Sequence, residues 1–133
     1  MSLPGIYTLA AETITTALSA RTYTEFTNLT GMTAATIEAA FTYGSGGATT
    51  IVWVQTSFDG GTVWRDVVRF DFATASAVKT KGLARGTQAL AAYAALSAEG
   101  ANDGLLGDRL RVAITTTGTY AGGTLLAVRA HVS

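Results

Sequence analysis

A strict alternation of apolar and polar side chains, repeated in several short runs, is the feature of this sequence that most constrains its fold. In one run, Ile37, Ala39 and Phe41 fall on one face, and polar or small residues alternate with them. Because successive side chains of a β-strand point to opposite faces, this period of two predicts half-buried antiparallel strands. The alternating runs occupy residues 35–43, 62–72, 109–115 and 124–132, and residues 49–56 form a run that is apolar on both faces.

Glycine-rich segments separate these runs and can supply the positive φ angles that hairpin turns require. No βαβ rhythm is present, and the 133 residues suffice for one domain with one core. The sequence therefore predicts an all-β, single-domain fold, an antiparallel β-sandwich or jelly-roll-like barrel, over residues 12–133. Residues 1–11 are apolar and almost free of charge, and we expect them to form a flexible N-terminal arm.

The segment from residue 83 to residue 100 has a different pattern, because it is rich in alanine. Leu90, Tyr93 and Ser97 have helical spacing, and Gly100 could end a short helix. The same residues could also form an irregular, largely extended crossover between strands. We favour the crossover.

The low charge of the chain excludes several classes of function. Nine basic residues balance nine acidic ones, so the clustered cations that bind nucleic-acid phosphates or membrane surfaces are missing. Charged residues make up only 14% of the sequence. This composition fits either a weakly charged soluble protein or a surface that is largely buried against partners. The N-terminal sequence does not resemble a signal peptide.

Residues suited to catalysis or metal binding are sparse. Cysteine is absent, and the single histidine, His131, belongs to an alternating run in which it faces outward beside Arg129. No serine lies in a G-x-S-x-G motif. The acidic residues between Glu99 and Asp108 do not have the spacing of an EF-hand loop. We therefore expect no enzymatic activity, no cofactor and no metal.

The segment Ser57–Trp64, "SFDGGTVW", is similar to the Asp-box hairpin pattern S-x-D-x-G-x-T-W, with Val63 in place of threonine. Asp59 can accept backbone hydrogen bonds across the turn, and Trp64 can pack on the base of the hairpin. Because the pattern occurs once, it predicts a turn between strands that end near Thr56 and resume near Thr62, and not a sugar site. The residues of this hairpin staple are Ser57, Asp59, Gly60, Gly61 and Trp64.

Three aromatic residues could instead form a platform that stacks on a sugar: Tyr43, Trp53 and Trp64. The alternation places Trp64 on the same face as Phe70, which favours packing of Trp64 in the core.

Three stretches together resemble a family of small β-sandwich proteins from the structural gene clusters of tailed phages and prophages. They are the W-V-Q-x-S-x-D-G-G-x-x-W sequence at Trp53–Trp64, the L-G-D-R-x-R-V sequence at Leu106–Val112 and the T-x-G-T-Y-A-G-G-T sequence at Thr116–Thr124. The resemblance implies a virion structural protein, most like a capsid decoration (cement) protein on the outer shell. It also implies assembly in the host cytoplasm, with the major capsid protein and further copies of the chain as partners, as a homo-oligomer such as a trimer.

Other functions remain open at this point. A head-completion, tail-terminator or tail protein of a phage is one alternative, and a carbohydrate-binding or adhesion module is another. The candidate partner contacts of the N-terminal arm are Leu3, Pro4, Ile6, Tyr7 and Leu9. The candidate contacts of the strands are Val52, Val54, Val63 and Val67, which could equally form the second inner face of the sandwich.

Overall fold

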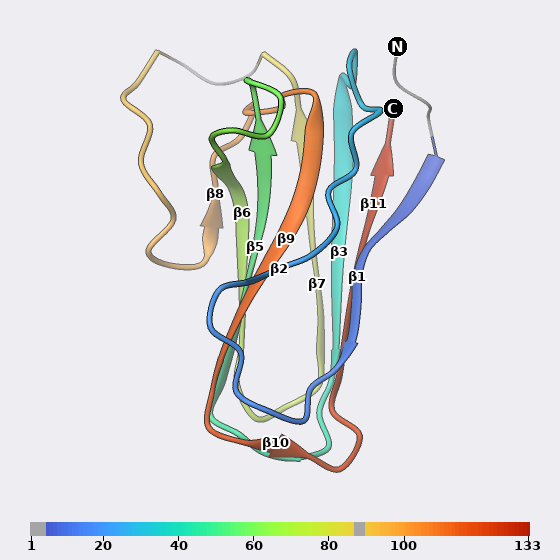
Figure 1. The fold of residues 1–133 in the computed structure, drawn as a ribbon, viewed down its shortest axis with the longest axis vertical. Helices are drawn as coiled ribbons and strands as arrows, with labels where there is room; N and C mark the ends of the chain where they lie inside the picture. Colours follow the sequence, from blue (N-terminus) through green and yellow to red (C-terminus); the bar gives the residue numbers. More distant parts are fainter. Residues whose placement is uncertain (1–4, 87–89) are drawn as a thin grey trace.

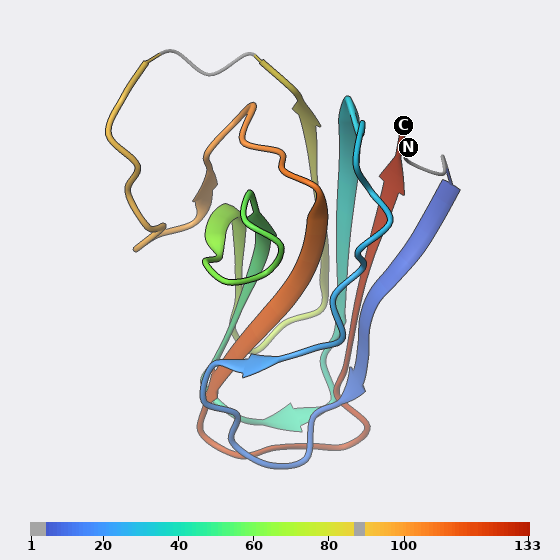
Figure 2. The same ribbon diagram turned by 45° about the horizontal axis from the view of Figure 1, so that its top comes forward.

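The computed structural model describes residues 5–86 and 90–133, which form two antiparallel sheets facing each other (Figures 1 and 2). The all-β sandwich that the alternation predicts is confirmed. The four-stranded sheet comprises, in spatial order, β1 (Gly5–Thr13), β11 (Leu125–Val132), β3 (Ala34–Thr42) and β7 (Ala77–Ala84). The five-stranded sheet comprises β2 (Arg21–Thr22), β9 (Arg109–Thr117), β5 (Thr49–Ser57), β6 (Arg65–Phe72) and β8 (Gly100–Ala101).

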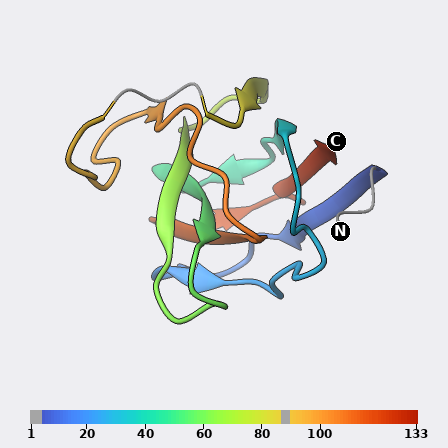
Figure 3. The ribbon, with the colours of Figure 1, turned by 90° about the horizontal axis from the view of Figure 1, so that it is seen from above.

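The two sheets face each other across the core (Figure 3). The core consists mainly of the inward side chains of their long strands. Phe41 of β3 stacks on Phe72 of β6, with ring centroids 5.1 Å apart. The segment that connects β1 to β3 closes one open side of the sandwich with four buried side chains: Ile14, Leu18, Leu29 and Met32. In the part of the chain that the structure describes, no helix has the length and apolar character needed to cross a membrane.

One end of the sandwich is closed by two crossing turns that pack unusually closely. They contain the short strands β4 (Ser45–Gly46) and β10 (Tyr120–Ala121), which pair with each other. The buried Tyr120 donates a hydrogen bond of 2.8 Å to the carbonyl of Ala73. A Cβ atom at Gly47, where φ is +68°, would lie 2.4 Å from the Tyr120 ring, so glycine is required there.

Two β-bulges change which side chains reach the core. In the pairing of β1 with β11, Thr8 and Ala10 oppose consecutive residues, so Leu9 is the extra residue. Leu9 and Ala10 are both buried as a result. In the pairing of β5 with β6, Val67 is the extra residue, and Val67 and Val68 are both buried.

These positions correct several expected partner contacts. Val52, Val54 and Val67 are completely buried, so they form the second inner face of the sandwich and not an outer contact. Leu9 is buried by its bulge. Tyr7 packs against the core, with its ring 5.4 Å from that of Phe26.

The expected arm is also corrected. Residues 5–11 belong to β1, which pairs with β11 over its whole length and thereby completes the edge of the four-stranded sheet. Leu3 and Pro4 lie outside the described residues. The other two expected contacts are exposed: Ile6 on β1, and Val63 between β5 and β6.

The alanine-rich segment is an irregular crossover, as we predict, over residues 90–99. It leaves the end of β7, runs along the outside of the five-stranded sheet and returns through β8 (Figure 1). Residues 87–89 lie outside the described residues.

A glycine substitution tests the close packing between β5 and the start of β9. We expect Gly107→Ala to lower the free energy of unfolding by about 1–3 kcal/mol, because its Cβ would lie 2.0 Å from the carbonyl oxygen of Ser57. Gly82→Ala is the matched control, since its Cβ would have no heavy atom within 4 Å. Urea unfolding of both variants measures the difference, and equal stabilities would contradict the proposed packing.

Candidate partner-binding surface

The hairpin staple between β5 and β6 is built around a ring of hydrogen bonds. The Ser57 hydroxyl donates to Oδ1 of Asp59 over 2.8 Å and accepts from the N–H of Gly61 over 2.9 Å. The same carboxylate oxygen accepts from the N–H groups of Thr62, at 3.1 Å, and Val63, at 2.9 Å. The N–H of Val63 and the hydroxyl of Ser57 lower the pKa of Asp59 below its ordinary value. The predicted role of Asp59 in the turn is confirmed.

The ends of the flanking strands differ slightly from the prediction. β5 continues to Ser57, and β6 begins only at Arg65. Gly60 and Gly61 have φ angles of +74° and +92°, as the turn requires.

Trp64 lies outside the core, so the prediction of core packing is wrong. The bulge at Val67 lies between Trp64 and Phe70 and reverses the alternation, so the two residues face opposite sides of the sheet. The indole N–H of Trp64 donates a hydrogen bond of 3.0 Å to the carbonyl of Gly61, which closes the hairpin. The guanidinium of Arg111 lies 4.3 Å from the centroid of its ring, a favourable cation–π arrangement. Burial lowers the pKa of Arg111.

The loop before β9 packs directly against this hairpin. The N–H of Gly107 donates to the hydroxyl of Thr56 over 2.8 Å, and that hydroxyl donates to the carbonyl of Arg109, also over 2.8 Å. The N–H of Asp108 donates to the carbonyl of Ser57 over 3.1 Å. Two of the three stretches that carry the family resemblance, Trp53–Trp64 and Leu106–Val112, therefore meet at one end of the sandwich.

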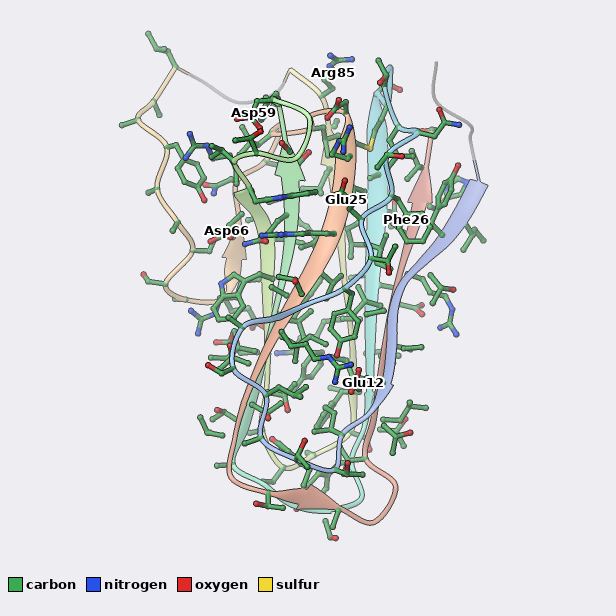
Figure 4. The ribbon with its side chains drawn as sticks, viewed as in Figure 1. Glu12, Glu25, Phe26, Asp59, Asp66 and Arg85 are labelled. Carbon is green, nitrogen blue, oxygen red and sulfur yellow. The ribbon has the colours of Figure 1, made fainter. Side chains whose placement is uncertain are left out.

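This hairpin end, consisting of residues 57–64, 28–33, 85–86 and 105–108, presents apolar side chains to solvent. Phe58 is 59% exposed and Val63 is 40% exposed. A shallow pocket of about 170 Å³ lies beside Phe58. Figure 4 shows Asp59 and Arg85 at this same end of the molecule, and β1 also begins there. The pocket is lined by Thr30, Gly31, Phe58, Arg85, Gly107 and Asp108.

An ion pair fixes a neighbouring segment against the hairpin end. Nη1 of Arg109 lies 2.6 Å from Oε1 of Glu25, and the next residue, Phe26, forms a β-bridge with Leu110. This ion pair lies beside the hairpin, because a Cβ atom at Gly61 would be 3.3 Å from Nη1 of Arg109.

Phe58 is absent from the contacts expected from the sequence. The sequence contains one signal for its exposure: the second position of the S-x-D turn pattern accepts any residue, and here it is a large aromatic one.

The outer face of the five-stranded sheet is partly covered by residues 90–99, which we call the strap. Oδ2 of the buried Asp66 accepts the N–H of Leu96 over 3.0 Å, and Oδ1 accepts the side-chain amide of Gln55 over 2.9 Å. The hydroxyl of Tyr93 accepts the N–H of Asp66 over 2.8 Å. Most side chains of the strap are exposed, so polar contacts rather than apolar burial hold it on the sheet.

The three aromatic residues considered for a sugar platform do not lie together. Trp53 donates its indole N–H to the carbonyl of Leu96 in the strap over 3.2 Å. Tyr43 is associated with the opposite end, where its hydroxyl donates to the carbonyl of Gly46 over 2.9 Å. Only Trp53 and Trp64 share the outer side of the five-stranded sheet.

A groove of about 550 Å³ runs along the open side between β7 and the β6–β8 pair. Two ion pairs bridge it: Lys79 with Glu99 at 2.6 Å, and Lys81 with Asp103 at 3.1 Å. Because each lysine is paired with an acidic residue, these four side chains together add no net charge to the groove.

His131 is exposed on the outer face of β11, as expected from the alternation. Among residues 5–86 and 90–133, no group of three or more His, Cys, Asp or Glu side chains is arranged to hold a metal ion. Comparison with known proteins adds no relative: no family model, curated protein or solved structure matches the chain.

The charge of Asp59 makes the stability of the hairpin depend on pH. Its lowered pKa means that the carboxylate stabilises the fold above the ordinary Asp pKa of about 4, and that this contribution is lost as the pH falls through the folded-state pKa. We therefore expect Asp59→Asn to melt at a lower temperature than the wild type at neutral pH. The two melting temperatures should converge in acid, and a gap that is constant between neutral and acid pH would contradict this account.

Asp66 should control the attachment of the strap. We expect Asp66→Ala to accelerate hydrogen exchange of the Leu96 amide by about tenfold, because a hydrogen bond to a charged group contributes roughly 1.5 kcal/mol or more. Asp103→Ala, which loses an ion pair with Lys81 but no contact with residues 90–98, is the matched control. Equal exchange rates in the two variants would show that other contacts hold the strap.

Proposed function

We propose that the protein is a structural component of a tailed-phage particle, a capsid decoration protein that binds the outer shell. The resemblance of three sequence stretches to phage structural proteins supports this proposal. The observation that carries it furthest is the hairpin end, where two of those stretches support the exposed side chains of Phe58 and Val63. An exposed aromatic residue on a rigid, hydrogen-bonded base is a suitable anchor for a protein partner.

The mechanism requires no covalent chemistry. Each copy would place its hairpin end on the major capsid protein at the shell surface, after assembly in the host cytoplasm. A single contact of this size is weak, but copies that are linked to one another bind with a high effective concentration. The shell would then resist internal pressure because each bound copy joins neighbouring subunits.

A glycan-binding module is the second candidate, since Trp53 and Trp64 both lie outside the core. Arg69 lies 5.4 Å from the Trp53 ring and Arg111 lies 4.3 Å from the Trp64 ring. Each indole therefore already has a cation over its ring, and the strap hydrogen-bonds to Trp53. These contacts leave less aromatic surface for a sugar than an open platform would, so we rank this candidate below the structural role.

Cosedimentation tests the proposal. Purified protein is mixed with empty capsids, and separately with tails, of the phage or induced prophage whose genome encodes the chain. We expect binding to capsids, and we expect Phe58→Ser to weaken it by at least about tenfold, as truncation of an aromatic anchor does. Leu125→Ser is the matched control, because Leu125 is 40% exposed at the start of β11, beside the turns that close the opposite end of the sandwich.

The other outcomes separate the alternatives. Binding to tails alone would assign the protein to the tail and contradict decoration. Binding to neither particle, together with retention on immobilised glycans that Trp64→Ala abolishes, would favour the glycan-binding module. Capsid binding that Phe58→Ser leaves unchanged would exclude the hairpin end as the contact surface.

A further inference from the structure

The outer face of the four-stranded sheet is open to solvent. No described segment of the chain lies over it, whereas the strap runs along the outside of the other sheet (Figures 1 and 3). The register of the strands arranges its outward side chains in rows that cross β1, β11, β3 and β7 in that order. Most of these side chains are Thr, Ala or Gly, so the face is flat and can approach another surface closely.

The central row contains one acidic and one basic residue, on the two middle strands. It consists of Thr8, Arg129, Glu38 and Thr80, all of them exposed. Glu38 and Arg129 are direct cross-strand neighbours, yet neither side chain takes part in an ion pair or hydrogen bond within the described residues. The centre of the face thus carries two opposite charges, and no residue among 5–86 and 90–133 forms an ion pair or hydrogen bond with either of them.

We propose that two copies of the chain associate through this face, about a two-fold axis that runs parallel to the strands between β3 and β11. In the dimer, β3 of one copy therefore lies opposite β11 of the other, and β1 lies opposite β7. The rotation does not shift positions along the strands, so each row faces the same row of the other copy. Arg129 of each copy then faces Glu38 of the other, and Thr8 faces Thr80. The interface is isologous, so one complementary contact occurs twice.

The two flanking rows are complementary under the same rotation. In one of them, Ile6 is 72% exposed at one end and Gly82 lies at the other. The rotation therefore places the large apolar side chain of this row against a residue without a side chain. His131 meets Thr36, and no two like charges meet.

The row on the other side contains Ala11, Ala127, Ala40 and Val78. Rotation places the 64% exposed Val78 against Ala11 and pairs Ala127 with Ala40. Large residues again face small ones, which allows the two sheets to approach to about 10 Å, the usual separation of packed sheets.

The size of the face fits a dissociable dimer. Four strands about 4.8 Å apart, over some seven residues of about 3.4 Å each, cover roughly 450 Å² per copy. The total of about 900 Å² lies close to the lower limit of specific interfaces. The dimer neither uses the hairpin end nor depends on the function proposed above, because it forms without any capsid.

Sedimentation equilibrium of the purified chain tests the proposal, from about 1 μM to about 1 mM, the range in which an interface of this size dissociates. We expect a monomer–dimer equilibrium. Glu38→Arg places arginine against arginine at both contacts, and Arg129→Glu places glutamate against glutamate. Each single variant should dimerise at least about tenfold more weakly, as expected for like charges in contact.

Mixing the two single variants is the decisive step. The arginine introduced by Glu38→Arg would face the glutamate introduced by Arg129→Glu, and the native Arg129 of the first variant would face the native Glu38 of the second. A mixed dimer should therefore form where neither variant dimerises alone. A mixture that remains monomeric would overturn the proposal, and so would a wild type that is monomeric throughout. A wild-type trimer, which the family resemblance implies, would also overturn it, because a three-fold axis does not produce these pairs.

A steric variant provides an independent check that does not alter the Glu38–Arg129 pair. Gly82→Arg should fold normally, since a Cβ there meets no heavy atom within 4 Å, but it should block the approach of Ile6 from the partner and abolish dimerisation. Ala92→Arg, on an exposed position of the strap, is the control and should dimerise like the wild type. Undiminished dimerisation of Gly82→Arg would show that another surface is used.

Discussion

Each long strand of this molecule has an apolar face, and the structure depends on the burial of these faces between the two sheets. Burial of apolar surface is the main source of stability for such a fold, and the core side chains come from both layers. Strict alternation would leave one residue of each consecutive pair, Leu9–Ala10 and Val67–Val68, in solvent, and a bulge at each place buries both. The remaining features, including the closing turns, the strap and the open face, are arranged around this closed double layer.

Features that depend on neighbouring residues in the chain could be predicted from the sequence. The alternating runs predict the strands, and the turn at Asp59 follows from side chains that hydrogen-bond within a few residues. This local chemistry explains why the fold class and the hairpin staple could be predicted.

Features that depend on pairing between distant strands could not be predicted. A bulge shifts the register by one residue and reverses the faces beyond it, so an alternation read along one strand does not show that Val67 is buried or that Trp64 is outside the core. The apolar run at Val52 and Val54 is compatible with an inner or an outer face until its partners are known. The pairing of residues 5–11 with β11 could not be predicted either, because the sequence of this segment does not show which strand lies beside it.

The two lysines of β7 have a consequence for how this chain behaves when many copies are crowded together. β7 is the edge strand of its sheet, and Lys79 and Lys81 point from it toward the inner side, where they pair with acidic residues of the β8 region. A foreign strand that extended the sheet at this edge would cover these charges and remove them from water. Inward-pointing charges of this kind protect natural sheets from edge-to-edge polymerisation. At a high local concentration of the protein, the β7 edge of the four-stranded sheet is therefore protected from strand addition by other copies.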